Sequence, residues 1–337
     1  MFSNKQIITL LFAASLLLAL MCACRSSQPR YTTIEGQALG TFITVKCNTT
    51  LDDQTLISEF QKIDEEAKAS MSIFDDNSLL SRINRNETDS LDKHITRNIE
   101  LSARFTELSC GAYDITIKPL TEAWGFAGKQ GDDTTPNIDS ILSFVGFDKI
   151  AIIDGRLRKE DSRIQLDFNS IAKGYTVDIT AERLEELGIS DYMVNIGGEI
   201  RCRGNNPEGK EWTIGIETPY DGNMAQDSFE KIISVSDCAV ATSGNYRRFY
   251  IDDNGKKVAH TLSPRTGYSV VSDLLSATVI APTCAEADAA ATMFMAMGSE
   301  GGALELAQRC AAEYGWSYYF IYADGEKYHI ECSEDLR

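Results

Sequence analysis

Apolar and polar positions alternate with a period of two at several places along the chain, and this pattern predicts strands. A short apolar run at 150–153 and another at 164–168 are expected to flank a turn at Asp154-Gly155, a dipeptide typical of tight turns. The strands predicted in this way are 31–48, 150–153, 164–168, 192–196, 212–216, 232–242 and 276–281.

Other stretches carry apolar residues three or four positions apart, which is the spacing of a helix that is buried on one face. Gly188 follows one of these stretches directly and is a good C-terminal signal. The predicted helices are 54–71, 98–108, 172–187, 286–297 and 302–314, and polar loops are expected at 128–137 and 221–227. Because strands and helices mix without a regular βαβ rhythm or a sequence repeat, the pattern predicts an α+β fold.

The chain of 337 residues is long enough for one large domain or two modest ones. Its formal net charge is −18, which argues against a nucleic-acid partner, since phosphate backbones require a basic surface. The same charge repels a free nucleotide. A nucleotide site in this protein would therefore need a metal ion or backbone N–H donors to offset the repulsion.

The N-terminus has the pattern of a secretory signal. Lys5 precedes the apolar run 7–21, which is too short for a comfortable transmembrane helix. The run ends at Cys22-Ala23-Cys24 and resembles a bacterial lipoprotein signal, in which a small residue precedes the lipidated cysteine. Cys24 is therefore expected to carry the lipid, with Cys22 as the alternative. We predict a signal peptide at 1–24, a polar tether at 25–32 and a folded domain at 33–337; an ordinary cleaved signal or a plain membrane anchor is the alternative.

Seven cysteines follow this signal, at positions 47, 110, 202, 238, 284, 310 and 332. An odd number without C-x-x-C spacing argues against a zinc site and against a complete disulfide framework. Most are expected to be small core residues, although an exported protein could still form one or two disulfides.

Glycine-rich turns are the first candidates for chemistry. Asn195-Ile-Gly-Gly-Glu199 follows a predicted strand, yet the chain contains neither the Rossmann nor the P-loop pattern. Paired glycines allow close approach to a ligand or to another strand, but a structural turn is their commoner role.

The segment Asp167-Phe-Asn-Ser-Ile-Ala-Lys-Gly174 leads from a predicted strand into a helix that starts near Ser170. A helix start offers N–H groups and a positive dipole end, which suit a phosphate group. Asp167 and Ser170 add oxygen donors, and Lys173 adds a positive charge. A plain helix cap with a surface lysine is an equally good explanation of the segment taken alone.

Asp288 and Thr292 are four residues apart on a predicted helix and share one face. A carboxylate and a hydroxyl are hard oxygen ligands of the kind that Mg²⁺ uses. In isolation, such a pair is more often solvated or part of a cap.

The chain has three histidines, and His260 leads into a tight loop marked by Pro264 and Gly267. A histidine in this position is a candidate general base, although a lone histidine is more often structural.

Taken in order, these weak motifs resemble the ApbE family of FAD:protein FMN transferases. The resemblance runs from about Gly40 to Gly298. It includes the blocks Leu39-Gly-Thr41, Met71-Ser-Ile-Phe-Asp75, Ser81-Arg-Ile-Asn84, Gly111-Ala-Tyr-Asp-Ile-Thr116, Trp124-Gly-Phe126, Asp167 to Gly174, Asn195 to Ile200, Ala241 to Arg247, His260 to Gly267 and Ala287 to Thr292.

The resemblance implies an ApbE-like fold in one large two-lobed domain. It also implies Mg²⁺-dependent transfer of FMN from the substrate FAD to a Ser or Thr hydroxyl of an acceptor protein, with release of AMP. Leu39, where the family usually has Met, and Phe74 match positions beside the flavin ring, and His260 matches a suspected general base. The matched FAD contacts are Ala112, Tyr113, Asp114, Asp167, Lys173 and Leu262; the matched Mg²⁺ ligands are Ser170, Asp288, Ala291 through its carbonyl and Thr292, with Ala172 as a further carbonyl candidate.

The acceptors of the family are flavin-carrying subunits of membrane redox complexes. An enzyme held by a lipid at the periplasmic side of the inner membrane would meet them there. Two alternatives use the same motifs: an Mg²⁺-dependent FAD pyrophosphatase that gives FMN and AMP, and a non-catalytic lipoprotein that binds FAD. A complete Mg²⁺ shell argues against the second, since FAD binding alone does not need one.

Overall fold

The computed structural model describes residues 30–127, 137–219, 229–246, 249–251, 255, 257–325 and 327–337. Several predicted segments lie outside the described residues: the signal peptide with Cys22 and Cys24, residues 25–29 of the tether, most of the loop at 128–137, all of the loop at 221–227 and Arg247. Residues 30–32 of the predicted tether belong to β1. None of the helices within the described ranges is both long and apolar enough to cross a membrane.

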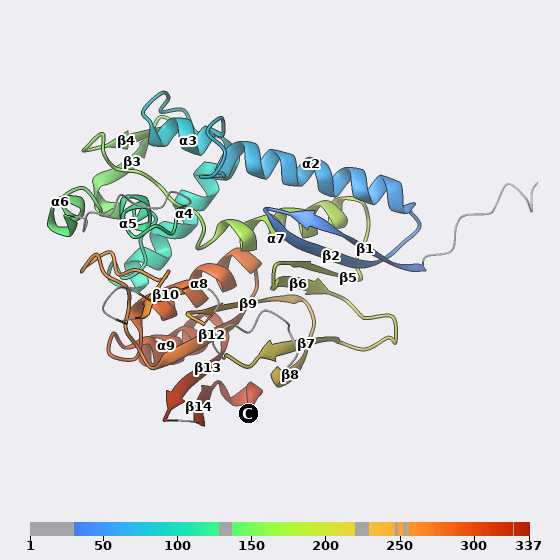
Figure 1. Cartoon of the computed structure of the whole chain (residues 1–337). Coiled ribbons are helices and arrows are strands. Elements are labelled where there is room, and N and C mark those ends of the chain that lie inside the picture. The colour runs from blue at the N-terminus through green and yellow to red at the C-terminus, as the bar shows by residue number, and fades with distance from the viewer. Residues whose placement is uncertain are drawn as a thin grey trace, which may run out of the picture.

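An eight-stranded antiparallel sheet forms the centre of the fold (Figure 1). The strands lie in the order β1-β2-β5-β6-β9-β12-β13-β14. Their bounds are β1 (Arg30–Ala38), β2 (Thr41–Thr49), β5 (Tyr192–Ile196), β6 (Glu199–Arg203), β9 (Cys238–Gly244), β12 (Leu274–Ala281), β13 (Ser317–Asp324) and β14 (Lys327–Cys332). Three small two-stranded sheets accompany it: β3 (Ile150–Ile153) with β4 (Arg156–Lys159), β7 (Trp212–Glu217) with β8 (Phe229–Val235), and β10 (Phe249–Ile251) with β11 (Lys257–Ala259).

Helices cover the sheet in two groups. The long helix α2 (Asp53–Met71) packs on β1 and on α7 (Ala172–Glu186), and α7 packs on β5 and β6. The helix α8 (Cys284–Met297) packs on β9, β12 and α7, with α4 (Lys93–Leu108) and α9 (Ala303–Tyr314) against it. The shorter helices are α3 (Leu79–Asn84), α5 (Lys118–Ala123) and α6 (Ile138–Leu142), with 3₁₀ turns at Phe147–Lys149 and Glu334–Leu336. The contact between α7 and α8 therefore joins the two groups.

The α+β class and most of the long predicted elements are confirmed. The predicted helices at 54–71, 172–187, 286–297 and 302–314 match α2, α7, α8 and α9 within two residues at each end. Gly188 follows α7 in the left-handed conformation (φ +79°), as its role as a C-terminal signal requires. The helix expected at 98–108 starts five residues earlier, because Asp92 caps the N–H of Ile95.

The prediction of a strand at 164–168 is wrong. The partner of β3 across the Asp154-Gly155 turn is β4, and 164–168 is extended chain with a single bridge from Gln165 to Ile117. Its apolar residues are buried, which explains the strand-like pattern, but its backbone bonds go elsewhere. The Asn84 side chain bonds both backbone groups of Leu166, at 2.7 Å and 2.9 Å, and the Asp167 N–H donates to Ile115 O.

The strand predicted at 232–242 is also wrong, because it is two strands that belong to different sheets. β8 ends at Val235 and β9 begins at Cys238, with Asp237 between them at φ +53°. Sequence periodicity missed this turn since Ser-Asp interrupts the apolar run only briefly. It also missed β4, β6, β10, β11, β13, β14 and the three short helices.

Candidate active site

A cavity lies where the segment after α4, the 167–170 segment, the end of β9, the His260 loop and α8 meet. Residues from five separate parts of the sequence line it, so the fold brings together positions that are more than 170 residues apart. Eight predicted site residues are among the lining residues: Ala112, Tyr113, Asp114, Asp167, Ser170, His260, Leu262 and Thr292. The other predicted site residues do not line this cavity; they are Leu39, Phe74, Lys173, Asp288 and Ala291.

The close contact of α7 with α8 depends on Gly174. A Cβ at this position would lie 2.3 Å from the Cys284 carbonyl oxygen and 2.7 Å from the Asp288 Cβ. The Gly174 N–H donates to Asp288 Oδ2 at 2.9 Å. Asp178, one turn further along α7, accepts the N–H groups of Cys284 and Ala285 at 2.8 Å each. The start of α8 is thus fixed to α7 through backbone donors.

This packing buries the Asp288 carboxyl, which is 3% exposed. Burial, followed by the negative charge of Glu199, raises its pKa to about 7. A cation close to this carboxyl would stabilise its ionised form. The solvated or capping role that is more usual for an Asp/Thr pair is therefore wrong for this residue.

Two hydroxyl pairs complete the oxygen-rich part of the cavity. Ser170, in the turn before α7, donates to the Tyr113 hydroxyl at 2.8 Å. Thr292, one turn after Asp288 on α8, lies 3.1 Å from the Ser243 hydroxyl at the end of β9. Within the described ranges, no three His, Cys, Asp or Glu side chains gather as a metal cluster. One carboxylate with hydroxyls is a donor set that fits Mg²⁺, which takes few protein ligands and shares the rest with substrate phosphates.

Asp114 and Asp167 shape the wall of the cavity. Asp114 accepts the N–H and hydroxyl of Thr116 and the N–H of Phe147, all within 2.8 Å, and burial raises its pKa. Asp167 caps the N–H of Asn169 at 2.8 Å and accepts from the Thr121 hydroxyl at 3.3 Å. Both carboxylates therefore fix the local backbone as well as lining the cavity.

His260 also lines the cavity and follows β11 directly. Its ring is half-buried and meets the Phe126 ring edge-on, with centroids 6.4 Å apart. The following loop is the tight turn that the sequence predicts: Gly267 N donates to Ser263 O, and Gly267 has φ +75°. Arg265 ties this loop to the end of α4 through the carbonyls of Ser109 and Cys110.

Leu39 sits in the tight turn of the β1–β2 hairpin, with φ +50° followed by Gly40 at +76°. A leucine in the left-handed region is strained. Its N–H donates to Asp64 of α2 at 2.8 Å, which helps to hold this conformation. Such outliers concentrate at functional sites, and here one coincides with a residue selected from sequence motifs.

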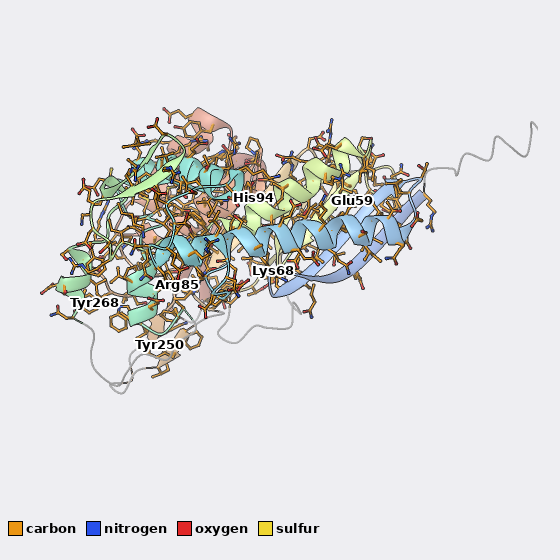
Figure 2. The ribbon with its side chains drawn as sticks, turned by 90° about the horizontal axis from the view of Figure 1, so that it is seen from above. Glu59, Lys68, Arg85, His94, Tyr250 and Tyr268 are labelled. Atoms are coloured by element: carbon orange, nitrogen blue, oxygen red, sulfur yellow. The ribbon has the colours of Figure 1, made fainter. Side chains whose placement is uncertain are left out.

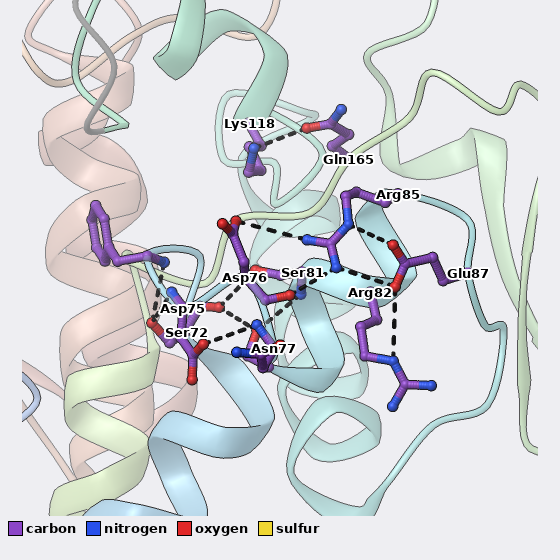
Figure 3. Close-up of polar contacts among 12 residues, drawn as sticks. Ser72, Asp75, Asp76, Asn77, Ser81, Arg82, Arg85, Glu87, Lys118 and Gln165 are labelled. Atoms are coloured by element: carbon purple, nitrogen blue, oxygen red, sulfur yellow. Dashed lines mark hydrogen bonds and ion pairs between the residues drawn. The ribbon is translucent and has the colours of Figure 1, made fainter.

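Phe74 is 62% exposed, in the loop between α2 and α3. Ser72 accepts the N–H groups of Phe74 and Asp75, and Ser78 and Ser81 donate to the Ser72 carbonyl (Figure 3). An aromatic side chain is thus presented to solvent by a well-fixed loop, next to the Arg85 contacts with Asp76 and Glu87.

Lys173 pairs with the buried Glu199 carboxylate, which comes from the Asn195–Glu199 motif. Two motifs that are separate in sequence therefore meet, and the Gly197-Gly198 pair forms the β5–β6 turn, with φ +62° and +104°. The lysine is not a plain surface residue.

Sequence reasoning did not select the other eight lining residues, namely Ile117, Thr121, Phe126, Asn169, Ser243, Thr261, Pro264 and Ala296. Phe126, Asn169, Ser243, Thr261 and Pro264 fall inside blocks that the sequence analysis identifies, so their signal was present. Ile117, Thr121 and Ala296 lie outside those blocks.

Known proteins resemble this chain over most of its length. The model of the ApbE family matches residues 39–315. The chain is 34% identical to the FAD:protein FMN transferase of Haemophilus influenzae, over 90% of this chain and 91% of the relative. It is 34% identical to that of Vibrio cholerae, over 86% and 87%. The solved flavin transferase ApbE from Vibrio cholerae superposes with a TM-score of 0.80 at 30% identity, covering 91% of this chain and 98% of that one.

Proposed function

The chain belongs to the ApbE family and is an enzyme of the transferase class, and we propose that it moves FMN from FAD onto a Ser or Thr hydroxyl of an acceptor protein with the help of Mg²⁺. The observation that carries this proposal is one cavity that is lined by the Ser170 and Thr292 hydroxyls and by His260, with the buried Asp288 carboxyl one helical turn before Thr292 on α8. Transfer needs all three, since a phosphorus centre, a leaving group and a nucleophile must meet at one place.

Ser170, Asp288 and Thr292 would hold the metal, with the Ala291 carbonyl as a further ligand. Mg²⁺ bound there neutralises phosphate oxygens and stabilises the negative charge on the departing AMP. The residues around it keep this arrangement fixed: Gly174 fixes Asp288, Tyr113 fixes Ser170 and Ser243 fixes Thr292. Water is excluded from Asp288 by the packing of α7 on α8.

FAD would lie with its adenosine end against Ala112, Tyr113 and Asp114, and with its flavin ring towards Leu39 and Phe74. Asp167, Lys173 and Leu262 would make the remaining contacts. The apolar cluster of Leu262 and Phe126 supports an aromatic base on that side. An exposed aromatic at Phe74 supports flavin stacking on the other side.

His260 would take the proton from the acceptor hydroxyl as that oxygen forms its bond to the FMN phosphorus and the bond to AMP breaks. A neutral hydroxyl is a poor nucleophile, and a base of near-neutral pKa is suited to activate it. The half-exposed position of His260 supports this role, because a protein acceptor must reach it from outside.

We also propose that Cys24 carries a lipid that holds the enzyme at the periplasmic side of the inner membrane, where flavin-carrying subunits of redox complexes would be its acceptors. The signal-like residues 1–24 support this proposal. Radiolabelled palmitate should be incorporated by the wild type and lost in Cys24→Ala; retention of label would transfer the role to Cys22.

The central test incubates the enzyme with FAD, Mg²⁺ and a candidate acceptor domain, and records flavin fluorescence of the acceptor in a denaturing gel. Fluorescence that depends on Mg²⁺ is the expected result. Release of AMP with an unlabelled acceptor would indicate a pyrophosphatase instead. FAD binding without any AMP would refute both enzymatic functions.

A further inference from the structure

Strands β6 and β9 are neighbours in the middle of the main sheet, and they place two cysteines opposite each other. We call this pairing of β6 with β9 the joint of the sheet. Cys202 is the register partner of Cys238, and both are thiols in this structure. The Cys202 Sγ lies 3.7 Å from the carbonyl oxygens of Val235 and Cys238. The proximity of the two thiols raises the pKa of Cys202 and lowers that of Cys238.

This geometry suits a disulfide. Residues directly opposite in an antiparallel pair have Cα atoms roughly 4.5–5.5 Å apart and share one face of the sheet. A disulfide requires a Cα separation of about 4.4–6.8 Å. The register of the two strands therefore places the two cysteines within the separation that a disulfide requires.

The other described cysteines lack this arrangement. Cys47 faces Thr32 and Tyr192, and Cys332 faces Tyr319. Cys284 and Cys310 lie on helices, and Cys110 is exposed in a turn after α4. They provide matched controls for the pair.

We propose that Cys202 and Cys238 form a disulfide that joins the two halves of the central sheet. The β6–β9 ladder pairs three residues on each strand, while the other ladders of this sheet pair five or more. The joint is therefore the weakest part of the sheet, and a covalent link there would hold it. Glu199 at the start of β6 and Ser243 near the end of β9 both belong to the site described above, so this joint also holds the site together.

The oxidant would be a small disulfide such as oxidised glutathione, or a thiol–disulfide exchange protein of the compartment to which the predicted signal directs the chain. Cys238 is the partly exposed thiol of the pair, so its thiolate attacks first and releases one thiol of the oxidant. The Cys202 thiolate then attacks the mixed disulfide and releases the second. Two protons leave the protein, and two electrons reduce the oxidant.

The test folds the full chain in a buffer of reduced and oxidised glutathione, blocks free thiols and analyses a non-reducing digest by mass spectrometry. The expected product is a Cys202–Cys238 peptide pair that is lighter by two hydrogens and separates on reduction. Because the link closes a loop of 36 residues, dithiothreitol should lower the melting temperature by roughly 5–10 °C.

Cys238→Ala should abolish both the linked peptide and the response to dithiothreitol, whereas Cys110→Ala should change neither. The mass measurement on the wild type decides the matter even if a variant folds poorly. Two blocked thiols at Cys202 and Cys238 after folding in the oxidising buffer, or a link from either residue to another cysteine, would overturn the proposal. Transfer activity is not needed for this test, so it can fail independently of the proposed function.

Discussion

The helix part and the loop part of the candidate site are built in different ways. On the helix side, Asp288 is buried between α7 and α8, and backbone donors and a glycine fix its position. On the loop side, His260 is half-buried beside Phe126, in a segment that is held by contacts from loops and from the end of α4. Tyr250 and Tyr268, both exposed, lie at this same end of the molecule, away from Glu59 at the far end of α2 (Figure 2).

This difference matches two chemical tasks. A group that holds a metal and a pyrophosphate must be fixed and dry, since electrostatic stabilisation depends on preorganisation in a site with little water. A group that accepts a proton from a second protein must be reachable from solvent. The following variants test each side separately.

The largest effect is expected for Asp288→Asn. The amide can still accept the Gly174 N–H, so the helix contact is preserved while the charge is lost. Transfer should fall by at least about 100-fold, since metal stabilisation of phosphate charge is worth several kcal/mol. Gel fluorescence and a calorimetric Mg²⁺ titration measure this, with the exposed Glu300→Gln near the end of the same helix as control. Unchanged Mg²⁺ affinity would remove Asp288 from the metal site.

Gly174→Ala should damage the helix side through packing rather than charge. The added methyl group would meet the Cys284 carbonyl oxygen, which is backbone and cannot move alone. Overpacking of this kind costs about 1–3 kcal/mol of unfolding free energy, readable from urea denaturation. Gly36→Ala is the control, because its Cβ would find ordinary contact with Ile43 at 3.6 Å. Equal stability of the two variants would contradict the close approach of α7 to α8.

His260→Ala tests the loop side. FAD binding should stay nearly intact, and transfer should slow by about tenfold or more, the low end for loss of a general base. The exposed His329→Ala on β14 is the matched control. Unchanged turnover, measured as the rate of acceptor flavinylation at saturating FAD, would exclude His260 from the proton transfer.

The smallest effect concerns His94, on α4 (Figure 2). Its Nδ1 lies 2.9 Å from the Tyr175 hydroxyl of α7, and burial lowers its pKa. The unfolded chain therefore takes up a proton on this histidine below about pH 6.5 before the folded chain does, so stability should fall as the pH drops through that range. Melting curves at pH 7.5 and 5.5 should show a smaller loss for His94→Gln than for the wild type. Identical losses would mean that His94 does not contribute.

Much of this protein can be predicted from its sequence alone, because the signals are local. The long helices follow from apolar spacing, and the 154–155 and 197–198 turns follow from their glycines. The motifs identified thirteen site residues by type and order, and eight of those that fall within the described ranges line one cavity. Local patterns and side-chain chemistry select only Asp167, Ser170, Lys173, Asp288, Thr292 and His260; the other seven follow from the family resemblance.

Only the tertiary structure decides how distant segments meet. Residues 164–168 look like a strand, yet Asn84 takes the place of a neighbouring strand by bonding both backbone groups of Leu166. The spacing of Asp288 and Thr292 is typical of a solvent-exposed pair on a helix. Asp288 is nevertheless buried, because Gly174 allows α7 to pack closely against α8. Cys202 and Cys238 share no motif, and their facing positions exist only in the register of β6 with β9. Pairings of this kind depend on packing between residues far apart in the chain, and the local spacing of apolar residues does not reveal them.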